Sequence, residues 1–169
     1  MITNKYGGAN MDLLVNLYDL QSKFQQEQLE KNEIVIKRAM SSDKTQILKF
    51  INDEYTQNWA DESENAFSNH PISCFVAIKK GQIVGFSCYD ATAKGYFGPI
   101  GIKSSEKGQH IGQGLLHHTL LAMKENGYGY AVIGWVDDAL NFYKKTTKVM
   151  EIPDSETENT LYQNLISKN

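Results

Sequence analysis

The amino-acid sequence predicts an α/β or α+β fold in one domain. Its 169 residues suit a single domain that buries most of its apolar surface. Short runs rich in β-branched and aromatic residues, which are typical of strands, alternate with segments whose apolar residues recur every three or four positions, which are typical of helices. No internal repeat or low-complexity tract interrupts this pattern. We therefore expect one sheet flanked by helices, with a crevice for a ligand.

The first 32 residues are expected to precede this domain. Residues 1–10 are expected to form a flexible tail. Over residues 11–32, apolar residues at helical spacing predict one amphipathic helix: Leu13, Leu17, Leu20 and Phe24. Such a helix would cover a flank of the domain, contact a second copy in a homodimer, or close over a substrate, and the pattern leaves these roles open.

The domain itself, residues 33–169, divides into strands and helices at turn and cap signals. Strands are expected at residues 33–39, 72–78, 83–89, 96–102 and 130–136, with a closing hairpin formed by residues 148–152 and 161–166. Helices are expected after the N-cap cluster at residues 41–43, at 61–67, at 112–126 before Gly127, and from the Asp137-Asp138 cap to Lys144.

Two cysteines fall in neighbouring predicted strands. A two-residue turn at Lys80-Gly81 places Cys74 opposite Ser87, so that Cys88 points to the other face of the sheet. A disulfide is therefore not expected, and both cysteines are interpreted as small buried apolar residues.

Charge and hydropathy exclude several classes of function. The net charge of -3 gives no reason to expect a nucleic-acid partner, which usually requires a basic patch. No apolar run is long enough to span a membrane, and the polar start carries no secretory signal, so we expect a cytoplasmic protein. His117 and His118 are adjacent and do not share a helical face, so no metal site is expected.

The most informative stretch runs from Phe97 to Leu116. A strand is followed by a polar loop with Lys103 and Lys107, and the chain then turns through Gly112 and Gly114 into a helix. Such a turn directs unpaired backbone N–H groups and the positive end of a helix dipole at one point, which is an anion site, most naturally for a phosphate. Glycines are also typical of any tight turn into a helix, so the pattern alone leaves both interpretations open. The nucleoside-triphosphate loop and the three-glycine dinucleotide fingerprint are absent.

Three segments together resemble the GNAT superfamily of acetyl-CoA-dependent N-acetyltransferases. These are Gly98-Pro99-Ile100-Gly101-Ile102, then residues 107–116, then Asn141-Phe142-Tyr143-Lys144-Lys145. The resemblance covers about residues 33–166 in order of elements, and its specific motifs are the loop and the Phe-Tyr segment. It implies a mixed, mostly antiparallel, twisted sheet of about six to seven strands flanked by helices, with splayed central strands four and five. It also implies acetyl-CoA as cofactor, without a metal.

The loop matches the family pattern Gln/Arg-x-x-Gly-x-Gly/Ala in two registers. In the literal register, Gln109, Gly112 and Gly114 satisfy the motif. In the other register, Lys107 takes the Arg place, His110 replaces the first glycine and Gly112 is the second. We favour this second register because the apolar residues after it then fall where helix packing requires them. The His110 side chain, however, crowds a place where the backbone should approach the ligand closely.

The resemblance implies a set of cofactor-binding residues on the strand, the loop and the later segment. These are Ile100, Gly101, Ile102, Lys107, Gly108, Gln109, His110, Ile111, Gly112, Gln113, Gly114, Asn141 and Tyr143. Glycines and a proline in the strand at residues 96–102 favour a bulge, which would leave backbone groups free for the pantetheine arm. Backbone N–H groups near residues 100–102 would also stabilise an oxyanion.

The resemblance implies acetyl transfer from acetyl-CoA to a primary amine of a small molecule or peptide, with Tyr143 as the catalytic acid that protonates the departing thiolate. Direct transfer is expected because no cysteine or serine has a recognisable base beside it in the sequence. A base must help the amine lose its proton, and Glu54, Asp90 and Asp137 are candidates. Candidates to line the acceptor pocket are Tyr55, Trp59, Asp90, Tyr96 and Trp135. The alternative is a non-catalytic CoA-binding regulatory module on the same fold, which His110 and the residues after Tyr143 keep open.

Overall fold

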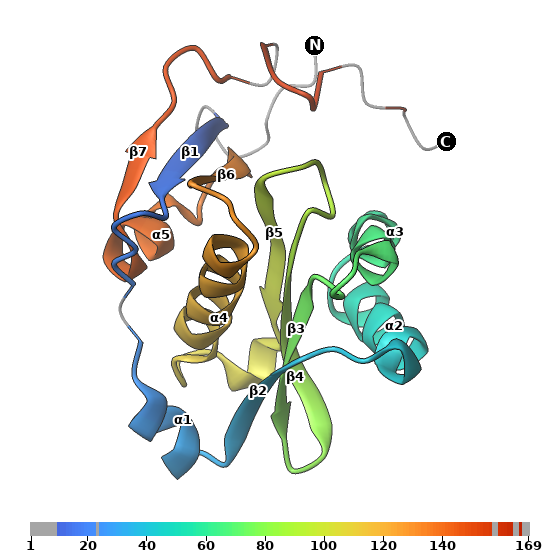
Figure 1. Cartoon of the computed structure of the whole chain (residues 1–169). Helices are drawn as coiled ribbons and strands as arrows, with labels where there is room; N and C mark the ends of the chain where they lie inside the picture. Colours follow the sequence, from blue (N-terminus) through green and yellow to red (C-terminus); the bar gives the residue numbers. More distant parts are fainter. Residues whose placement is uncertain (1–9, 23, 157–158, 164–165, 167–169) are drawn as a thin grey trace.

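A computed structural model describes residues 10–22, 24–156, 159–163 and 166. In this part of the chain, seven strands form one sheet in the order β2-β3-β4-β5-β6-β1-β7 (Figure 1). The strands are β1 (Met11–Asn16), β2 (Ile34–Arg38), β3 (Cys74–Lys79), β4 (Gln82–Tyr89), β5 (Tyr96–Ile102), β6 (Tyr130–Val136) and β7 (Val149–Glu151). The helices are α1 (Gln26–Lys31), α2 (Lys44–Glu54), α3 (Gln57–Glu64), α4 (Ile111–Glu125) and α5 (Leu140–Thr146), with short 3-10 turns at Ser41–Asp43, Asn65–Ser68 and Ser104–Glu106.

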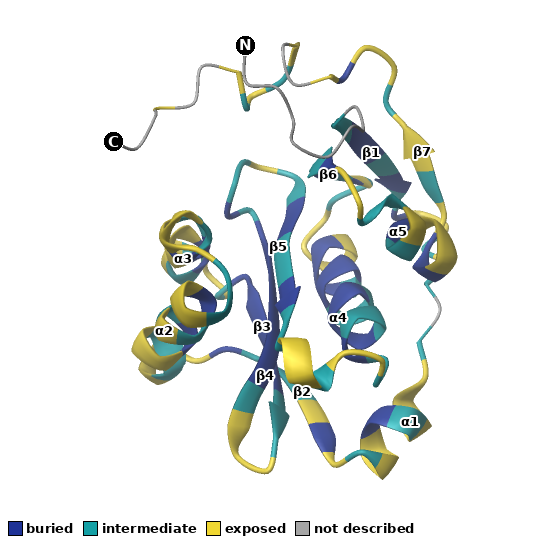
Figure 2. Ribbon diagram, turned by 180° about the vertical axis from the view of Figure 1, so that it is seen from behind, coloured by how far each residue is buried: buried dark blue, intermediate teal, exposed yellow. Residues whose placement is uncertain are grey.

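The sheet is mixed and mostly antiparallel, which confirms the predicted fold class. Only β5 and β6 pair in parallel among the described strands. Helix α4 packs on one face of the sheet, and α2 and α3 pack on the other (Figure 1). Figure 2 shows α4 largely buried, whereas α2 and α3 expose their outer sides. Each face carries its own apolar cluster, so the sheet is covered on both sides as an α/β sheet requires.

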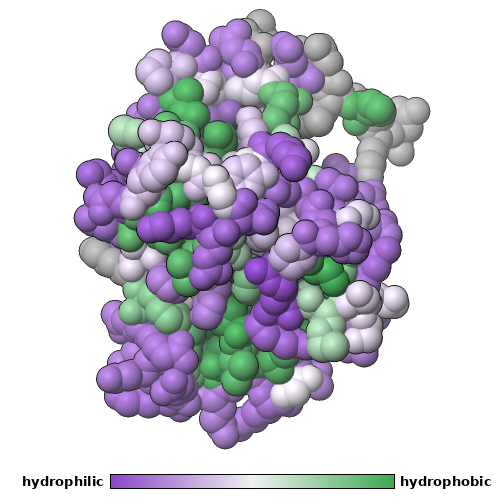
Figure 3. Space-filling view, viewed as in Figure 1, coloured by the Kyte–Doolittle hydropathy of each residue, from purple (hydrophilic) through white to green (hydrophobic). Residues whose placement is uncertain are grey.

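Because the apolar side chains are largely buried between the sheet and the helices, the outer surface is mostly polar. On the face shown in Figure 3, hydrophilic residues predominate and apolar residues form separate patches among them. None of the helices in the described ranges combines the length and the apolar character that a bilayer crossing requires.

The prediction of one helix over residues 11–32 is wrong, because this segment contains strand β1 and the short helix α1. Strand β1 lies between β6 and β7 and pairs antiparallel with both. Leu13, Val15 and Leu17 are all buried, since every second residue of a strand points to the same face. A spacing of four residues fits a helix turn and also two strand periods, so Leu13 and Leu17 alone did not distinguish them. The tail predicted for residues 1–10 lies outside the described residues, except for Asn10.

The predicted closing hairpin is also wrong. Strand β7 pairs with β1 at the opposite end of the sequence, so its partner is not the segment after residue 160. Residues 161–163 form a turn, and residues 164–165 lie outside the described part.

Strands β5 and β6 diverge in the middle of the sheet, as predicted. They pair only at Tyr96 with Val132 and at Phe97 with Ile133. Beyond this point β4 is the strand with which β5 pairs among the described strands. Between Phe97 and Ile100, three residue steps on β5 oppose two steps on β4. This is the predicted bulge. Gly98 has φ +116°, a backbone conformation that a side chain rarely tolerates, which explains a glycine at this place. The divergence opens a wedge above the N-terminus of α4.

Cys74 lies directly opposite Cys88, and not opposite Ser87 as predicted. The register shifts between Ala77 and Ile78, because β4 carries one more residue than β3 in this stretch. Both cysteines are free and fully buried, which agrees with their interpretation as small core residues.

Candidate functional site

Two cavities adjoin where β5 and β6 diverge. The first, which we call the loop cavity, has a volume of about 590 Å³ and lies between the end of β5 and the start of α4. The second, which we call the aromatic cavity, has a volume of about 400 Å³ and lies between β5, β6 and α3. Ile100, Ala139 and Tyr143 line both cavities. A ligand in the loop cavity can therefore reach a second ligand in the aromatic cavity through this junction.

Most of the predicted cofactor-binding residues line the loop cavity. They are Ile100, Gly101, Ile102, Lys107, Gly108, His110, Ile111, Gly112, Gln113 and Tyr143. Gln109, Gly114 and Asn141 do not line it, so the structure does not bring them to this place.

The reasons differ for these three residues. The Gln109 side chain accepts a hydrogen bond from Lys79 Nζ at 3.0 Å and donates one to the Glu106 carboxylate at 2.6 Å, so it belongs to a polar cluster behind the loop. Gly114 is buried, and a Cβ there would lie 2.6 Å from Ile36 Cδ1, so this glycine allows close packing of α4. Asn141 is exposed. The literal register of the loop motif depends on Gln109 and Gly114, which do not line the cavity. The three residues of the other register, Lys107, His110 and Gly112, all line it.

The start of α4 presents free backbone donors to the loop cavity. Among the described residues no side chain caps this helix, and the Gly114 N–H is bonded to the His110 carbonyl at 3.1 Å. The N–H groups of Ile111, Gly112 and Gln113 precede that first helical bond and have no helical partner. With the positive end of the helix dipole behind them, they form a site suited to an anion.

His110 stands before α4 with φ +62° and ψ +13°, in the left-handed region. A residue with a Cβ pays about 1–2 kcal/mol for this conformation, whereas glycine does not. In the second register of the loop motif the family pattern has glycine at this place, and glycine adopts the conformation without this cost. The His110 ring turns towards α4, where Nδ1 lies 3.1 Å from Gln113 Oε1.

Tyr55 lies in the loop cavity and not in the acceptor pocket as predicted. Its hydroxyl donates to the Ile102 carbonyl and accepts from the Ile102 N–H, both at 2.7 Å. The next amide, Lys103 N–H, bonds to Val84 on β4, so the Ile102 groups face the wedge. The expectation that this backbone is free is therefore wrong at Ile102.

Tyr143 lies on α5 at the junction of the cavities. Its ring packs edge-on against Phe97, with ring centres 6.3 Å apart, and beside Phe142 at 5.2 Å. Burial raises the pKa of the Tyr143 phenol far above its usual value of 10, and the nearby Asp137 carboxylate raises it further. The phenol is therefore protonated throughout the neutral range and can donate a proton. The predicted Asp137-Asp138 cap is wrong, because α5 begins at Leu140 with Ala139 as its N-cap residue.

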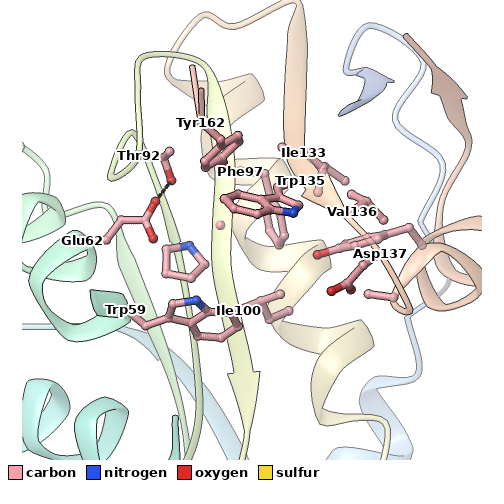
Figure 4. A pocket seen from close by; sticks show the side chains of 15 residues that line it. Trp59, Glu62, Thr92, Phe97, Ile100, Ile133, Trp135, Val136, Asp137 and Tyr162 are labelled. Carbon is pink, nitrogen blue, oxygen red and sulfur yellow. Dashed lines mark hydrogen bonds between the residues drawn. The ribbon is translucent and has the colours of Figure 1, made fainter. Parts of the chain in front are cut away.

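The aromatic cavity contains two of the predicted acceptor residues, Trp59 and Trp135 (Figure 4). Trp59 is stacked on Tyr55, with ring centres 4.8 Å apart. Trp135 packs against Tyr162 at 4.9 Å. Trp135 has φ +50°, and its N–H donates to the Asp12 carboxylate at 2.9 Å, so the N-terminal strand β1 holds this residue in place.

Two predicted acceptor residues lie elsewhere. The Asp90 carboxylate accepts hydrogen bonds from Gly95 N–H and the Tyr128 hydroxyl, both at 2.7 Å, and so holds the β4–β5 connection. Tyr96 lines neither cavity, although it lies close to Gly134, which lines the aromatic cavity. Glu54, a candidate base, lines neither cavity.

Sequence reasoning missed three polar residues of the aromatic cavity: Glu62, Thr92 and Tyr162. Glu62 stands three residues after Trp59 on α3, a spacing that places both on one helical face, so this signal was available. Thr92 and Tyr162 come from a loop and from the C-terminal segment, and no local pattern connects them. The Thr92 hydroxyl donates to Glu62 (Figure 4).

Comparisons with known proteins agree with this arrangement. The family model described as Acetyltransferase (GNAT) family matches residues 43–147, which include α2, the wedge and α5. No curated protein matches the sequence. Among solved structures, a GCN5-related glucosamine N-acetyltransferase region of a fungal multi-domain GH3 beta-N-acetylglucosaminidase is similar, with 17% identity and a TM-score of 0.69 over 86% of this chain and 20% of that one.

Two bacterial structures are also similar in fold. One is a GCN5-related N-acetyltransferase from Sphaerobacter thermophilus, with 15% identity and a TM-score of 0.64 over 85% of this chain and 50% of that one. The other is a GNAT family acetyltransferase from Brucella melitensis in complex with acetyl-CoA, with 15% identity and a TM-score of 0.52 over 73% of this chain and 91% of that one. The chain thus spans a fifth of the fungal protein and half of the Sphaerobacter protein. Because the family model covers more than half of the sequence, the chain belongs to the GNAT family of acetyltransferases.

Proposed function

We propose that this protein transfers an acetyl group from acetyl-CoA directly to a primary amine of a small molecule or peptide. The observation that carries the proposal is the junction of the two cavities, where Tyr143 is available to both. The loop cavity offers backbone N–H donors for the anionic groups of a cofactor and apolar side chains for its arm. The aromatic cavity offers aromatic rings and carboxylates for an amine. A donor and an acceptor held in this way react as if they were one molecule.

The loop cavity fits coenzyme A by the chemistry of its lining. The N–H groups at the start of α4 and the Lys107 side chain suit the diphosphate, and the apolar side chains of Ile100 and Phe142 suit the pantetheine arm. Bound acetyl-CoA would supply an activated acetyl group as a thioester. The other steps depend on the residues of this chain.

In the reaction, the amine nitrogen bonds to the acetyl carbon and the carbon–sulfur bond breaks. The protein must therefore remove a proton from nitrogen and supply one to sulfur. Tyr143 supplies the second proton, because its raised pKa keeps the phenol protonated, and solvent then returns a proton to the phenolate. Asp137, in the same cavity, attracts the ammonium form and accepts the first proton through water. For a lysine-like amine at pH 7, deprotonation costs about 4–5 kcal/mol, which a nearby carboxylate and desolvation reduce.

The proposal is tested by calorimetry with coenzyme A and by a thiol-release screen of acetyl-CoA against amino acids, polyamines, aminoglycosides and peptides. We expect coenzyme A to bind and thiol release to require an amine. Binding of coenzyme A without transfer to any amine would instead identify a regulatory module. The absence of binding would contradict both functions.

Tyr55→Phe tests whether the cofactor uses the backbone of Ile102. The variant leaves the Ile102 N–H and C=O without a partner in the free protein, so we expect a lower melting temperature. If the pantetheine arm takes these groups, coenzyme A no longer competes with the Tyr55 hydroxyl, and its Kd should fall about 5- to 10-fold, the value of one net hydrogen bond.

Calorimetry and a thermal melt of the two proteins provide the measurements. Tyr130→Phe, which removes the hydroxyl of a half-exposed tyrosine outside both cavities, is the matched control and should change neither value. An unchanged or weaker affinity in Tyr55→Phe would mean that the cofactor does not reach Ile102.

A further inference from the structure

The aromatic cavity contains two carboxylates that face one space from different elements. Glu62 comes from α3, and Asp137 follows β6; Figure 4 shows them on opposite sides of the cavity. Within the described residues, neither carboxylate has a lysine or arginine within 4.0 Å, and the residues that line the cavity include no cationic side chain. Glu62 is partly buried and Asp137 is exposed, and two negative charges on one cavity without a cationic side chain attract a cationic ligand.

Glu62 is held in position for a ligand. Its Oε1 accepts the hydrogen bond from Thr92, so the carboxylate is oriented and Oε2 remains for another donor. Tyr162 lines the same cavity, and burial, followed by the Glu62 charge, raises the pKa of its phenol. Glu62 therefore contributes an oriented negative charge on the side of the cavity opposite Asp137 (Figure 4).

Aromatic rings line the path between the two carboxylates. Trp59 lies at one side and Trp135 and Tyr162 at the other (Figure 4). Their positions are fixed by stacking of Trp59 on Tyr55 and by the contact of Trp135 with Tyr162. Such rings accept alkyl chains and stabilise ammonium groups over their faces.

We infer that the acceptor is an amine with two positive charges, a compact α,ω-diamine, whose reacting nitrogen lies at Asp137 and Tyr143 while its distal ammonium binds Glu62. This inference rests on the proposed function and specifies its substrate class. A monoamine satisfies one carboxylate and leaves the other without a cation, whereas a diamine satisfies both and places its methylenes against the indoles. Glu62 is thus a specificity-determining residue, which contacts the nitrogen that does not react.

The test compares 1,4-diaminobutane and 1,5-diaminopentane with butylamine and pentylamine, chains of equal length with one charge fewer. In the unmodified protein, kcat/KM should be at least about tenfold higher for the diamines, the value of one charged hydrogen bond in a partly buried site. Glu62→Gln should reduce this ratio about tenfold, mainly through KM, because the reacting nitrogen does not touch Glu62. Glu62→Asp, which keeps the charge, should restore part of the preference.

Glu64→Gln is the matched control on the same helix. Glu64 pairs with Lys44 at 2.7 Å on the surface and lines neither cavity, so this variant should keep the preference for diamines. Equal kcat/KM for diamines and monoamines, or an equal loss for both in Glu62→Gln, would overturn the inference.

Calorimetry of each amine with the protein and coenzyme A separates this inference from the proposed function. If diamines bind, depend on Glu62, and are not acetylated, the binding inference holds and the proposed reaction fails. If monoamines and diamines are acetylated equally, the proposed reaction holds and the diamine inference fails.

Discussion

In Tyr143→Phe, turnover with a saturating amine is expected to fall about 100-fold or more, the usual contribution of a positioned general acid. Phenylalanine keeps the ring between Phe97 and Phe142 and removes only the hydroxyl. The KM for acetyl-CoA should therefore change little. The measurement is steady-state thiol release with the best amine from the screen, together with a thermal melt that verifies the fold.

The pH dependence gives a second readout of Tyr143. Because burial raises the phenol pKa above its usual value of 10, the phenol is fully protonated below that pH and loses its proton only above it. We expect no decline of kcat from this group up to pH 10. A decline centred below pH 9 that Tyr143→Phe removes would contradict the assignment, as would unchanged turnover in the variant.

Tyr128→Phe is the matched control for Tyr143→Phe. Tyr128 is also a tyrosine with a raised pKa, about 12, owing first to burial and then to the Asp90 carboxylate. It lines neither cavity. Its variant should keep turnover close to that of the unmodified protein, so that a shared loss in both variants would indicate a structural effect and not acid catalysis.

Ala139→Trp is expected to reduce acetyl transfer about 100-fold, the cost of displacing reacting groups by about an ångström. Ala139 lines both cavities and is partly exposed between them, so an indole there would fill the junction. The loop cavity would remain, and the diphosphate end of coenzyme A should still bind. Thiol release measures the loss of acetyl transfer. Calorimetry with 3′-phosphoadenosine 5′-diphosphate, the diphosphate end of coenzyme A, measures the binding that should remain.

Ala139→Ser is the control, because it changes the residue and adds only one oxygen. It should keep most of the activity. Transfer at the normal rate in Ala139→Trp would show that the acetyl group does not pass the junction and that the two cavities do not serve one reaction.

Local patterns predicted the centre of the fold well. Strands β5 and β6 have the predicted bounds, and α4 differs by one residue at each end. Gly127, expected to end α4, has φ +94°, a conformation for which glycine is the natural residue. These elements could be predicted because apolar periodicity and glycine signals lie within a few residues of each other.

Pairing between strands that are far apart in the chain could not be predicted from these local patterns. The apolar residues of β1 fit a helix and a strand equally, and the pairing with β6 and β7 decided between them. The cysteine register failed for a similar reason, since one extra residue in β4 shifted every later pair. Tyr55 was assigned to the wrong cavity because its hydroxyl bonds to Ile102, 47 residues away.

The sequence by itself indicated the family, and through that resemblance the divergence of β5 and β6, because each of the motifs that carry the resemblance is continuous in the chain. The loop from Lys107 to Gln113 is one of these motifs. Only the tertiary structure decided which side chains share the aromatic cavity. Trp59, Trp135 and Tyr162 come from three distant segments, and Asp12 of β1 holds the Trp135 backbone. The physical reason is that a strand or helix is specified by local periodicity, whereas a cavity is formed by packing between elements, and packing depends on register and pairing across the whole chain.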